Sequence, residues 1–82
     1  MTPLRKIIAR NLRTLRRARG LGQVELAVIA GVDRSYISDI EQGKYGVSID
    51  KIDTLAAALG VAPWEMLHPH TASNAGKAAP EN

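Results

Sequence analysis

The sequence predicts an all-α fold, a compact single domain of five helices. Apolar side chains recur three and four residues apart along several stretches, the spacing that places them on one face of a helix. Glycines follow these stretches, and glycine readily adopts the left-handed backbone that ends a helix. With 82 residues, one tryptophan and no phenylalanine, the chain is expected to form a thin core of leucine, isoleucine, valine and alanine.

Each expected helix has recognisable ends. We expect helices at about 3–19, 23–30, 34–42 and 49–59, and a brief fifth helix that begins at Pro63. Thr2, Asp33 and Ser48 are suited to cap the first, third and fourth helices, because their side-chain oxygens accept from free backbone N–H groups. The side chains expected to point inward are Leu4, Ile7, Ile8, Leu12, Leu15 and Ala18 in the first helix, and Ile49, Ile52, Leu55, Ala56 and Leu59 in the fourth.

The apolar pattern stops at His68. Residues 69–82 are mostly alanine, serine, asparagine, glycine and proline with few charges, so they bury too little surface to fold. We therefore expect a folded domain over residues 1–68 and a disordered tail over residues 69–82.

Residues 23–41 carry the most informative pattern. Two short amphipathic segments are separated by Gly31, with Ala27 small where two helix axes cross and Ile37 and Ile40 facing inward from the second segment. This spacing predicts a helix-turn-helix, a unit known mainly for placing its second helix in the major groove of DNA.

Charge and composition narrow the functional class. Residues 1–46 hold nine basic and four acidic side chains, a balance of +5, whereas residues 47–82 have a balance of −2, so the half with the helix-turn-helix favours a polyanionic partner. The chain has no cysteine, no apolar run near the ~20 residues needed to span a bilayer, and no signal-peptide pattern at its start. These features predict a soluble, cytoplasmic protein.

Several linked motifs resemble one family. The runs are Leu21 to Ala27, Gly31-Val32, Tyr36 to Gly43, and Leu55 to Val61, and together they are similar to the Cro and phage-repressor type of helix-turn-helix domain, also called the XRE family. The resemblance covers about residues 4–67. It implies a lambda-repressor-like five-helix domain that binds a (pseudo)palindromic operator in double-stranded DNA as a homodimer and regulates transcription. Small phage repressors, restriction–modification controller proteins and antitoxins share this likeness.

The resemblance also implies roles for individual residues. Positions that read base edges in family members are Arg34, Ser35, Ser38 and Asp39 here, although Arg34 could instead contact phosphate and Asp39 could be solvated. Phosphate contacts are expected from Gln23, Tyr36, Lys44 and Arg17, with packing against the second helix as the other role for Tyr36. Arg10 and Arg13 are further candidates on the first helix. Arg16 and Glu41 match an internal ion pair. Dimer contacts are expected from Val47, Val61, Trp64, Met66 and Leu67, unless they only close the core.

Other functional classes have weaker support. An antitoxin or adaptor of the same fold, whose main partner is another protein, is the alternative. No nucleophile–base set suggests an enzyme, and no cofactor or small-molecule ligand is evident. His68 and His70 alone make a poor metal site. The apolar stripe of the first helix is explained by a core, which disfavours binding to a membrane surface.

Overall fold

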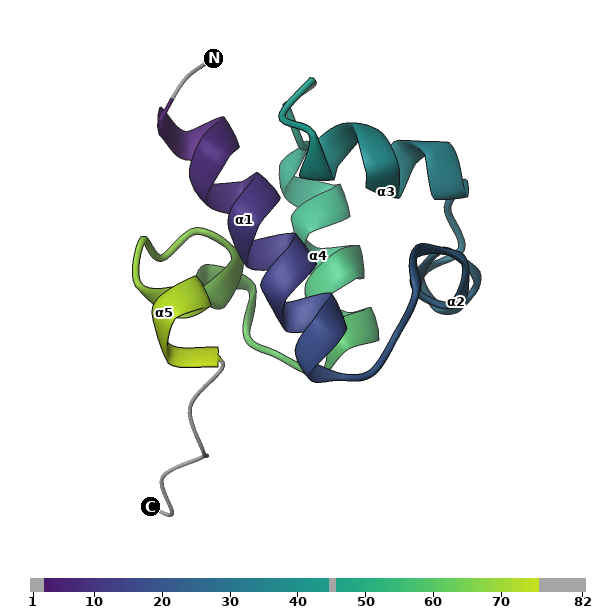
Figure 1. Cartoon of the computed structure of the whole chain (residues 1–82). Coiled ribbons are helices and arrows are strands. Elements are labelled where there is room, and N and C mark those ends of the chain that lie inside the picture. The colour runs from purple at the N-terminus through teal and green to yellow at the C-terminus, as the bar shows by residue number, and fades with distance from the viewer. Residues whose placement is uncertain (1–2, 45, 76–82) are drawn as a thin grey trace.

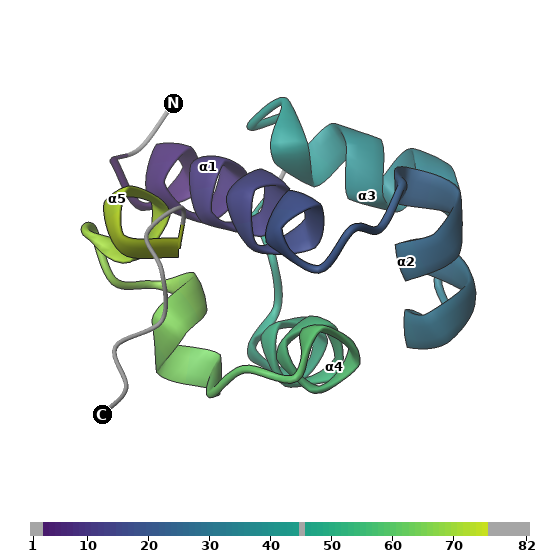
Figure 2. The ribbon, with the colours of Figure 1, turned by 60° about the horizontal axis from the view of Figure 1, so that its bottom comes forward.

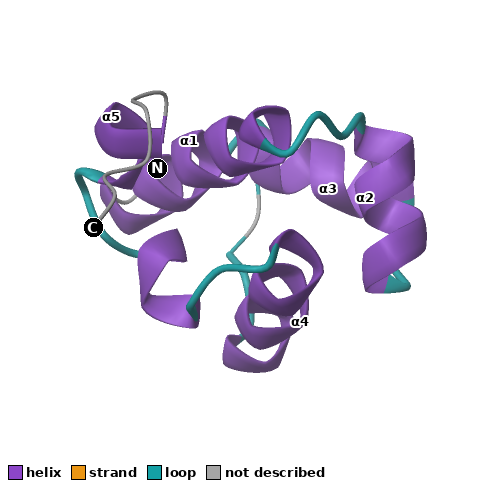
Figure 3. Cartoon of the chain, turned by 90° about the horizontal axis from the view of Figure 1, so that it is seen from below, coloured by secondary structure: helices purple, strands orange, loops and turns teal. Residues whose placement is uncertain are grey.

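The computed structural model describes residues 3–44 and 46–75, and within these ranges it is all-α, as predicted. The helices are α1 (Pro3–Ala18), α2 (Gln23–Ala30), α3 (Arg34–Glu41), α4 (Ile49–Leu59), the 3₁₀ helix η1 (Pro63–Met66) and α5 (Thr71–Ala75). Figure 3 shows that short loops join them. None of these helices is both long enough and apolar enough to cross a lipid bilayer. The expected cap Thr2 lies outside the described residues.

The helices enclose one core. Figure 1 shows α2 and α3 on one side of α1 and α5 on the other, and Figure 2 shows α1 and α3 side by side above α4. The buried cluster between them is built largely of aliphatic side chains: Ile8, Leu12, Leu15, Leu26, Ala27, Ile37, Ile40, Ile52, Leu55, Ala56, Leu59 and Met66. The predicted core composition is therefore confirmed.

Three side chains expected to point inward do not. Leu4 and Ala18, near the two ends of α1, are exposed, and Ile49 at the start of α4 is 79% exposed. Each lies in the first or last turn of its helix. The apolar periodicity continues to the helix ends, but the core that covers the middle of the helix does not reach these turns.

The turn between α2 and α3 forms as predicted. Gly31 has a φ of 72°, a left-handed conformation, and the N–H of Val32 bonds to the carbonyl of Ala27 at 3.0 Å. Leu26 and Ala27 of α2 are buried with Ile37 and Ile40 of α3. The turn and this shared core fix α3 in one orientation against α2.

Capping differs between helices. The Ser48 hydroxyl accepts from the backbone N–H of Lys51 at 3.2 Å, so its predicted cap is confirmed. Asp33 occupies the N-cap position of α3, but its side chain makes no capping hydrogen bond.

The segment after η1 packs on α1, although the composition of residues 69–82 predicts no structure there. The Asn11 side chain is fully buried, and its amide donates to the carbonyls of Met66 at 2.9 Å and His68 at 2.8 Å. Its oxygen accepts from the N–H of Ala72 at 3.1 Å in α5. One buried asparagine thus holds a segment with little apolar surface of its own. Residues 76–82 lie outside the described part.

Candidate nucleic-acid interface

The second helix of the helix-turn-helix presents a polar outward face. On α3, Arg34 and Ser35 are exposed, while Ser38 and Asp39 are half-buried. Ile37 and Ile40 are at most 1% exposed and anchor the opposite face in the core. The four predicted base-reading side chains therefore share the exposed side of a helix that cannot rotate without exposing its apolar side.

Arg34 is already engaged in the protein alone. Its Nη1 donates to Oε1 of Gln23, at the start of α2, over 2.9 Å. The Nε2 of Gln23 in turn donates to Oε1 of Glu41 at 3.1 Å. Gln23 therefore joins the first residue of α3 to the last residue of the same helix, and its side chain is fixed from both ends.

Glu41 is the centre of this network. Arg16 donates to it twice, from Nε to Oε2 at 2.7 Å and from Nη2 to Oε1 at 3.0 Å, which confirms the predicted ion pair between α1 and α3. Burial desolvates the Glu41 carboxylate and alone raises its pKa, but the hydrogen bonds from Arg16 and Gln23 and the nearby arginine charges outweigh this effect. The pKa of Glu41 is therefore lowered, and the same pair raises the pKa of Arg16 through the hydrogen bond.

The end of α3 carries further polar contacts. Gln42 donates from Nε2 to the Ser38 hydroxyl at 2.8 Å, one helical turn away. Lys44 Nζ lies 3.9 Å from an Asp39 oxygen, which places a cation beside the acidic member of the outward face. Gln42 belongs to this face but is missing from the predicted set; its spacing of four residues from Ser38 was the signal for it.

The predicted phosphate-contacting side chains differ in how exposed they are and in what they contact within the protein. Lys44 and Arg17 are exposed, and Gln23 is half-buried beside Arg34. Tyr36 is half-buried against the core cluster, and its burial raises the pKa of the hydroxyl. Arg10 donates instead to the carbonyl of Pro69 at 2.8 Å.

Arg13 is also bound within the protein. Its Nη2 donates to the backbone carbonyl of Glu41 at 3.2 Å, and its Nε lies 3.6 Å from a Glu41 carboxylate oxygen. Its side chain is nevertheless 45% exposed.

The predicted dimer contacts are not equivalent. Met66 is fully buried, so its side chain belongs to the core, and its assignment as an interface residue was wrong. Val47 and Val61 are half-buried against that core. Trp64 and Leu67 are 63% and 36% exposed, and they place apolar surface on the outside of η1 and the residue after it.

Within residues 3–44 and 46–75, no group of three His, Cys, Asp or Glu side chains is placed to hold a metal ion. His68 and His70 lie together, with ring centroids 5.6 Å apart. The His68 Nδ1 accepts from the backbone N–H of His70 at 3.1 Å, so this contact lies within the turn that precedes α5.

Known proteins resemble this chain in sequence and in structure. A hypothetical transcription factor from Neisseria meningitidis is 41% identical over 66 residues, which make up 80% of this chain and 62% of that protein. The crystal structure of a hypothetical transcription factor from Neisseria superposes with a TM-score of 0.78, covering 80% of this chain and 76% of that one at 41% identity. This chain thus spans less than two thirds of the Neisseria meningitidis relative's length.

Two control proteins are similar over most of their lengths. The control protein C.BamHI from Bacillus amyloliquefaciens is 36% identical over 72 residues, or 87% of this chain and 89% of that protein. The crystal structure of the restriction-modification controller protein C.AhdI from Aeromonas hydrophila is 42% identical with a TM-score of 0.73, covering 76% of this chain and 94% of that one. The family described as "Helix-turn-helix domain" matches residues 7–68. This chain belongs to the helix-turn-helix family, of the XRE type that its motifs indicated.

Proposed function

We propose that this protein is a sequence-specific regulator of transcription that binds double-stranded DNA with α3 in the major groove. The observation that carries the proposal is the rigid outward face of α3, where Arg34, Ser35, Ser38 and Asp39 are held by a core on the opposite side. A helix fits the width of the major groove, and polar side chains on its exposed face can reach base edges there.

Arg34 and Asp39 have the chemistry to distinguish bases. An arginine can donate two parallel hydrogen bonds to O6 and N7 of guanine, and a carboxylate can accept from the amino group of cytosine. Lys44, 3.9 Å from Asp39, offsets the repulsion between that carboxylate and nearby phosphates. Ser35 and Ser38 can donate or accept, so they add contacts with little selectivity.

Phosphates would be held around this face rather than on it. The start of α2 at Gln23 offers free backbone N–H groups, which favour anions. Lys44 and Arg17 add exposed cations, and the Tyr36 hydroxyl can donate from the core edge. These contacts carry no sequence information, but they fix the register of α3 on the duplex.

We further propose a homodimer on a (pseudo)palindromic operator. Trp64 and Leu67 expose apolar surface, with Val47 and Val61 half-buried as additional candidates. A core as thin as this one gains stability from association. Two copies of α3 that enter successive major grooves on one side of DNA would read half-sites ~34 Å apart.

A protein partner is the second candidate function. Val24, Val28 and Ile29 are 56%, 76% and 57% exposed on α2, which gives this helix an apolar outer surface. In this alternative an antitoxin-like or adaptor role would dominate, and DNA binding would be secondary or absent.

Fluorescence anisotropy with a labelled duplex separates the two candidates. The protein is titrated against genomic fragments at low and moderate salt, with single-stranded DNA of equal length as the control, and sedimentation gives its oligomeric state. A regulator binds duplex preferentially and retains some fragments as salt rises. Absence of duplex affinity at low salt contradicts the proposed function.

A further inference from the structure

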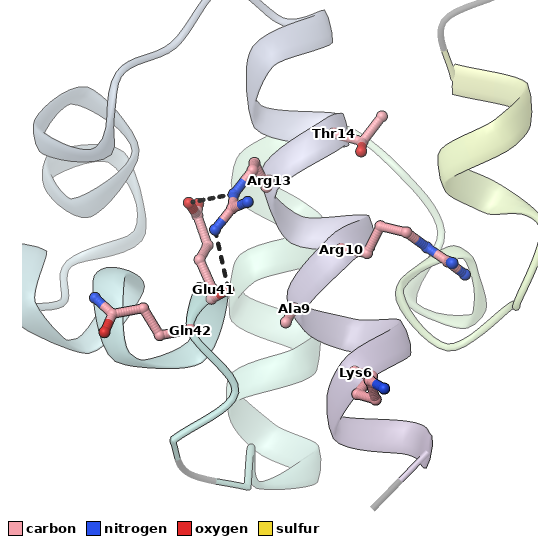
Figure 4. A pocket seen from close by; sticks show the side chains of 7 residues that line it. All are labelled: Lys6, Ala9, Arg10, Arg13, Thr14, Glu41 and Gln42. Atoms are coloured by element: carbon pink, nitrogen blue, oxygen red, sulfur yellow. Dashed lines mark hydrogen bonds and ion pairs between the residues drawn. The ribbon is translucent and has the colours of Figure 1, made fainter. Parts of the chain in front are cut away.

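We propose that the groove between α1 and the end of α3 holds a phosphate of the DNA backbone, an inference that rests on the proposed function. The groove has a volume of about 240 Å³. Figure 4 shows the side chains around it: Lys6, Ala9, Arg10, Arg13 and Thr14 from α1, and Glu41 and Gln42 from α3. Arg10 and Arg13 were further phosphate-contact candidates from the sequence, but Lys6 was not among them.

The groove offers donors that the protein does not use. Within the described residues, the Lys6 ammonium and the Thr14 hydroxyl make no hydrogen bond or ion pair. Ala9 contributes only a methyl group, which leaves the space between the two helices open. Arg10 borders the groove but points toward the α5 side, where it donates to Pro69 (Figure 4). The lining of the groove therefore includes one uncommitted cation, Lys6, and one uncommitted hydroxyl, Thr14, about two turns apart on α1.

The charge of Lys6 is not needed to neutralise Glu41. Arg16 already donates two hydrogen bonds to that carboxylate. Arg13 donates to the backbone carbonyl of Glu41 at the end of α3. Lys6 contributes to neither interaction. Its positive charge is therefore available to an anion that approaches from solvent.

The groove is continuous with the proposed DNA-binding surface on two sides. Gln23 Nε2 and Arg13 Nε both approach Oε1 of Glu41, at 3.1 and 3.6 Å, so Arg13 lies between the start of α2 and the groove. Gln42 lines the groove and bonds to Ser38 on the outward face of α3. A DNA strand that contacts Gln23 and follows α3 toward its end would pass Arg13 and Gln42 before it reaches Lys6.

The test compares two variants of the full chain that each lose one positive charge, one from α1 and one from the residue that follows α1. Lys6→Gln removes the groove cation, whereas Arg19→Gln removes an arginine whose Nη1 donates to the Leu59 carbonyl at the far end of the helix. Duplex affinity is measured by anisotropy over a range of salt concentrations. The slope of log K against log salt is about −0.9 for each phosphate neutralised. We expect Lys6→Gln to reduce the slope by about one and Arg19→Gln to leave it unchanged.

Further measurements keep the outcome unambiguous. Lys6→Arg should restore the wild-type slope, and circular dichroism shows that each variant is folded at the assay temperature. If the wild-type protein binds duplex and Lys6→Gln has the same slope as Arg19→Gln, the groove inference is wrong while the proposed function stands. If the wild-type protein does not bind duplex, the proposed function itself fails.

A titration of the DNA-free protein with inorganic phosphate, followed by NMR, separates the two possible sources of phosphate. We expect only weak shifts at Ala9 and Gln42, because one free phosphate lacks the neighbouring contacts of a strand. Saturable phosphate binding that Lys6→Gln abolishes, together with an unchanged DNA slope, would assign the groove to a small anion and overturn the backbone proposal.

Discussion

Arg34 and Gln23 are joined by a hydrogen bond of 2.9 Å, from the first residue of α3 to the first residue of α2. The other end of the Gln23 amide is held by Glu41 at 3.1 Å. The side chain proposed to read a base is thus oriented before DNA arrives, by a residue placed where a phosphate is expected. Pre-ordering of this kind lowers the conformational entropy that is lost on binding.

Replacing Arg34 by alanine should weaken binding to the preferred site by about 1–3 kcal/mol and relax the preference at one base pair per half-site. Arg34→Lys keeps the charge but loses the planar fork, so it should retain non-specific affinity and lose most of the discrimination. Anisotropy on the preferred site and on a scrambled duplex measures both. Equal loss on the two duplexes would make Arg34 a phosphate contact.

Gln23→Ala tests whether the Arg34 contact matters for recognition. The variant removes the acceptor for Arg34, so the guanidinium becomes free to adopt other rotamers. We expect the effects of Gln23→Ala and Arg34→Ala on the free energy of specific binding to be non-additive, because neighbouring contacts share their contribution. Strict additivity in the double variant would show that the hydrogen bond in the free protein has no role in binding.

Lys44 should contribute a phosphate contact. Lys44→Ala is expected to weaken binding to every duplex and to lower the salt slope by about one unit, because one released counterion fewer accompanies binding. Asp39→Asn, which removes the neighbouring negative charge, is the paired comparison and should strengthen non-specific binding. An unchanged slope in Lys44→Ala removes this residue from the footprint.

The Arg16–Glu41 pair should dominate the stability of the α1–α3 contact. Both side chains are nearly inaccessible, so Glu41→Ala leaves a buried unpaired guanidinium and should lower the free energy of unfolding by about 3–5 kcal/mol. Replacing both partners, as in Arg16→Met with Glu41→Leu, should recover much of this loss. Urea denaturation measures each variant, and a near-neutral Glu41→Ala would contradict the interpretation.

The same pair predicts a direction of pH dependence. Because the pKa of Glu41 is lower in the folded protein than its ordinary value of 4.5, its contribution to stability is complete above that value. The contribution is lost as the pH falls through the lowered pKa, where the folded carboxylate becomes protonated. The unfolding temperature should therefore fall less between pH 6 and pH 3 in Glu41→Gln than in the wild-type protein. The value of each protein at pH 6 serves as its own reference.

Truncation separates the two parts of the sequence that composition alone assigns to one tail. Removing residues 76–82 leaves every described contact in place and should not change the unfolding temperature. Removing residues 69–82 deletes the partners of Asn11 and Arg10 in the turn and α5, so it should lower the free energy of unfolding by about 1–3 kcal/mol. Equal unfolding temperatures for the two truncations would show that α5 does not stabilise the domain.

Much of the fold could be predicted because its signals are local. Gly31, Ser48 and the spacing of Ile37 and Ile40 determine where helices end and which side of α3 is buried. The positions that failed depend on distant neighbours. Ile49 fits the apolar period of α4 but lies beyond the surface that would cover it, and Met66 cannot be distinguished from exposed Trp64 without knowing how η1 docks.

The site shows the same division. The outward placement of Arg34 and Ser35 follows from helix periodicity, whereas the proposed role of Lys6 depends on how the end of α3 packs beside α1. Asn11 has no periodic signal, since a polar residue in a helix is ordinarily exposed. Only the folded chain brings its amide to the carbonyls of Glu65, Met66 and His68.

Selection of bound fragments from random duplex DNA, with wild-type protein and Arg34→Ala in parallel, tests the central claim most directly. If α3 reads base edges from a symmetric dimer, the wild-type protein enriches an inverted repeat whose half-sites are about one turn, ~34 Å, apart. Arg34→Ala then loses its preference at one position in each half-site. Enrichment of no sequence, or of the same sequence with equal stringency by both proteins, would contradict base reading by α3.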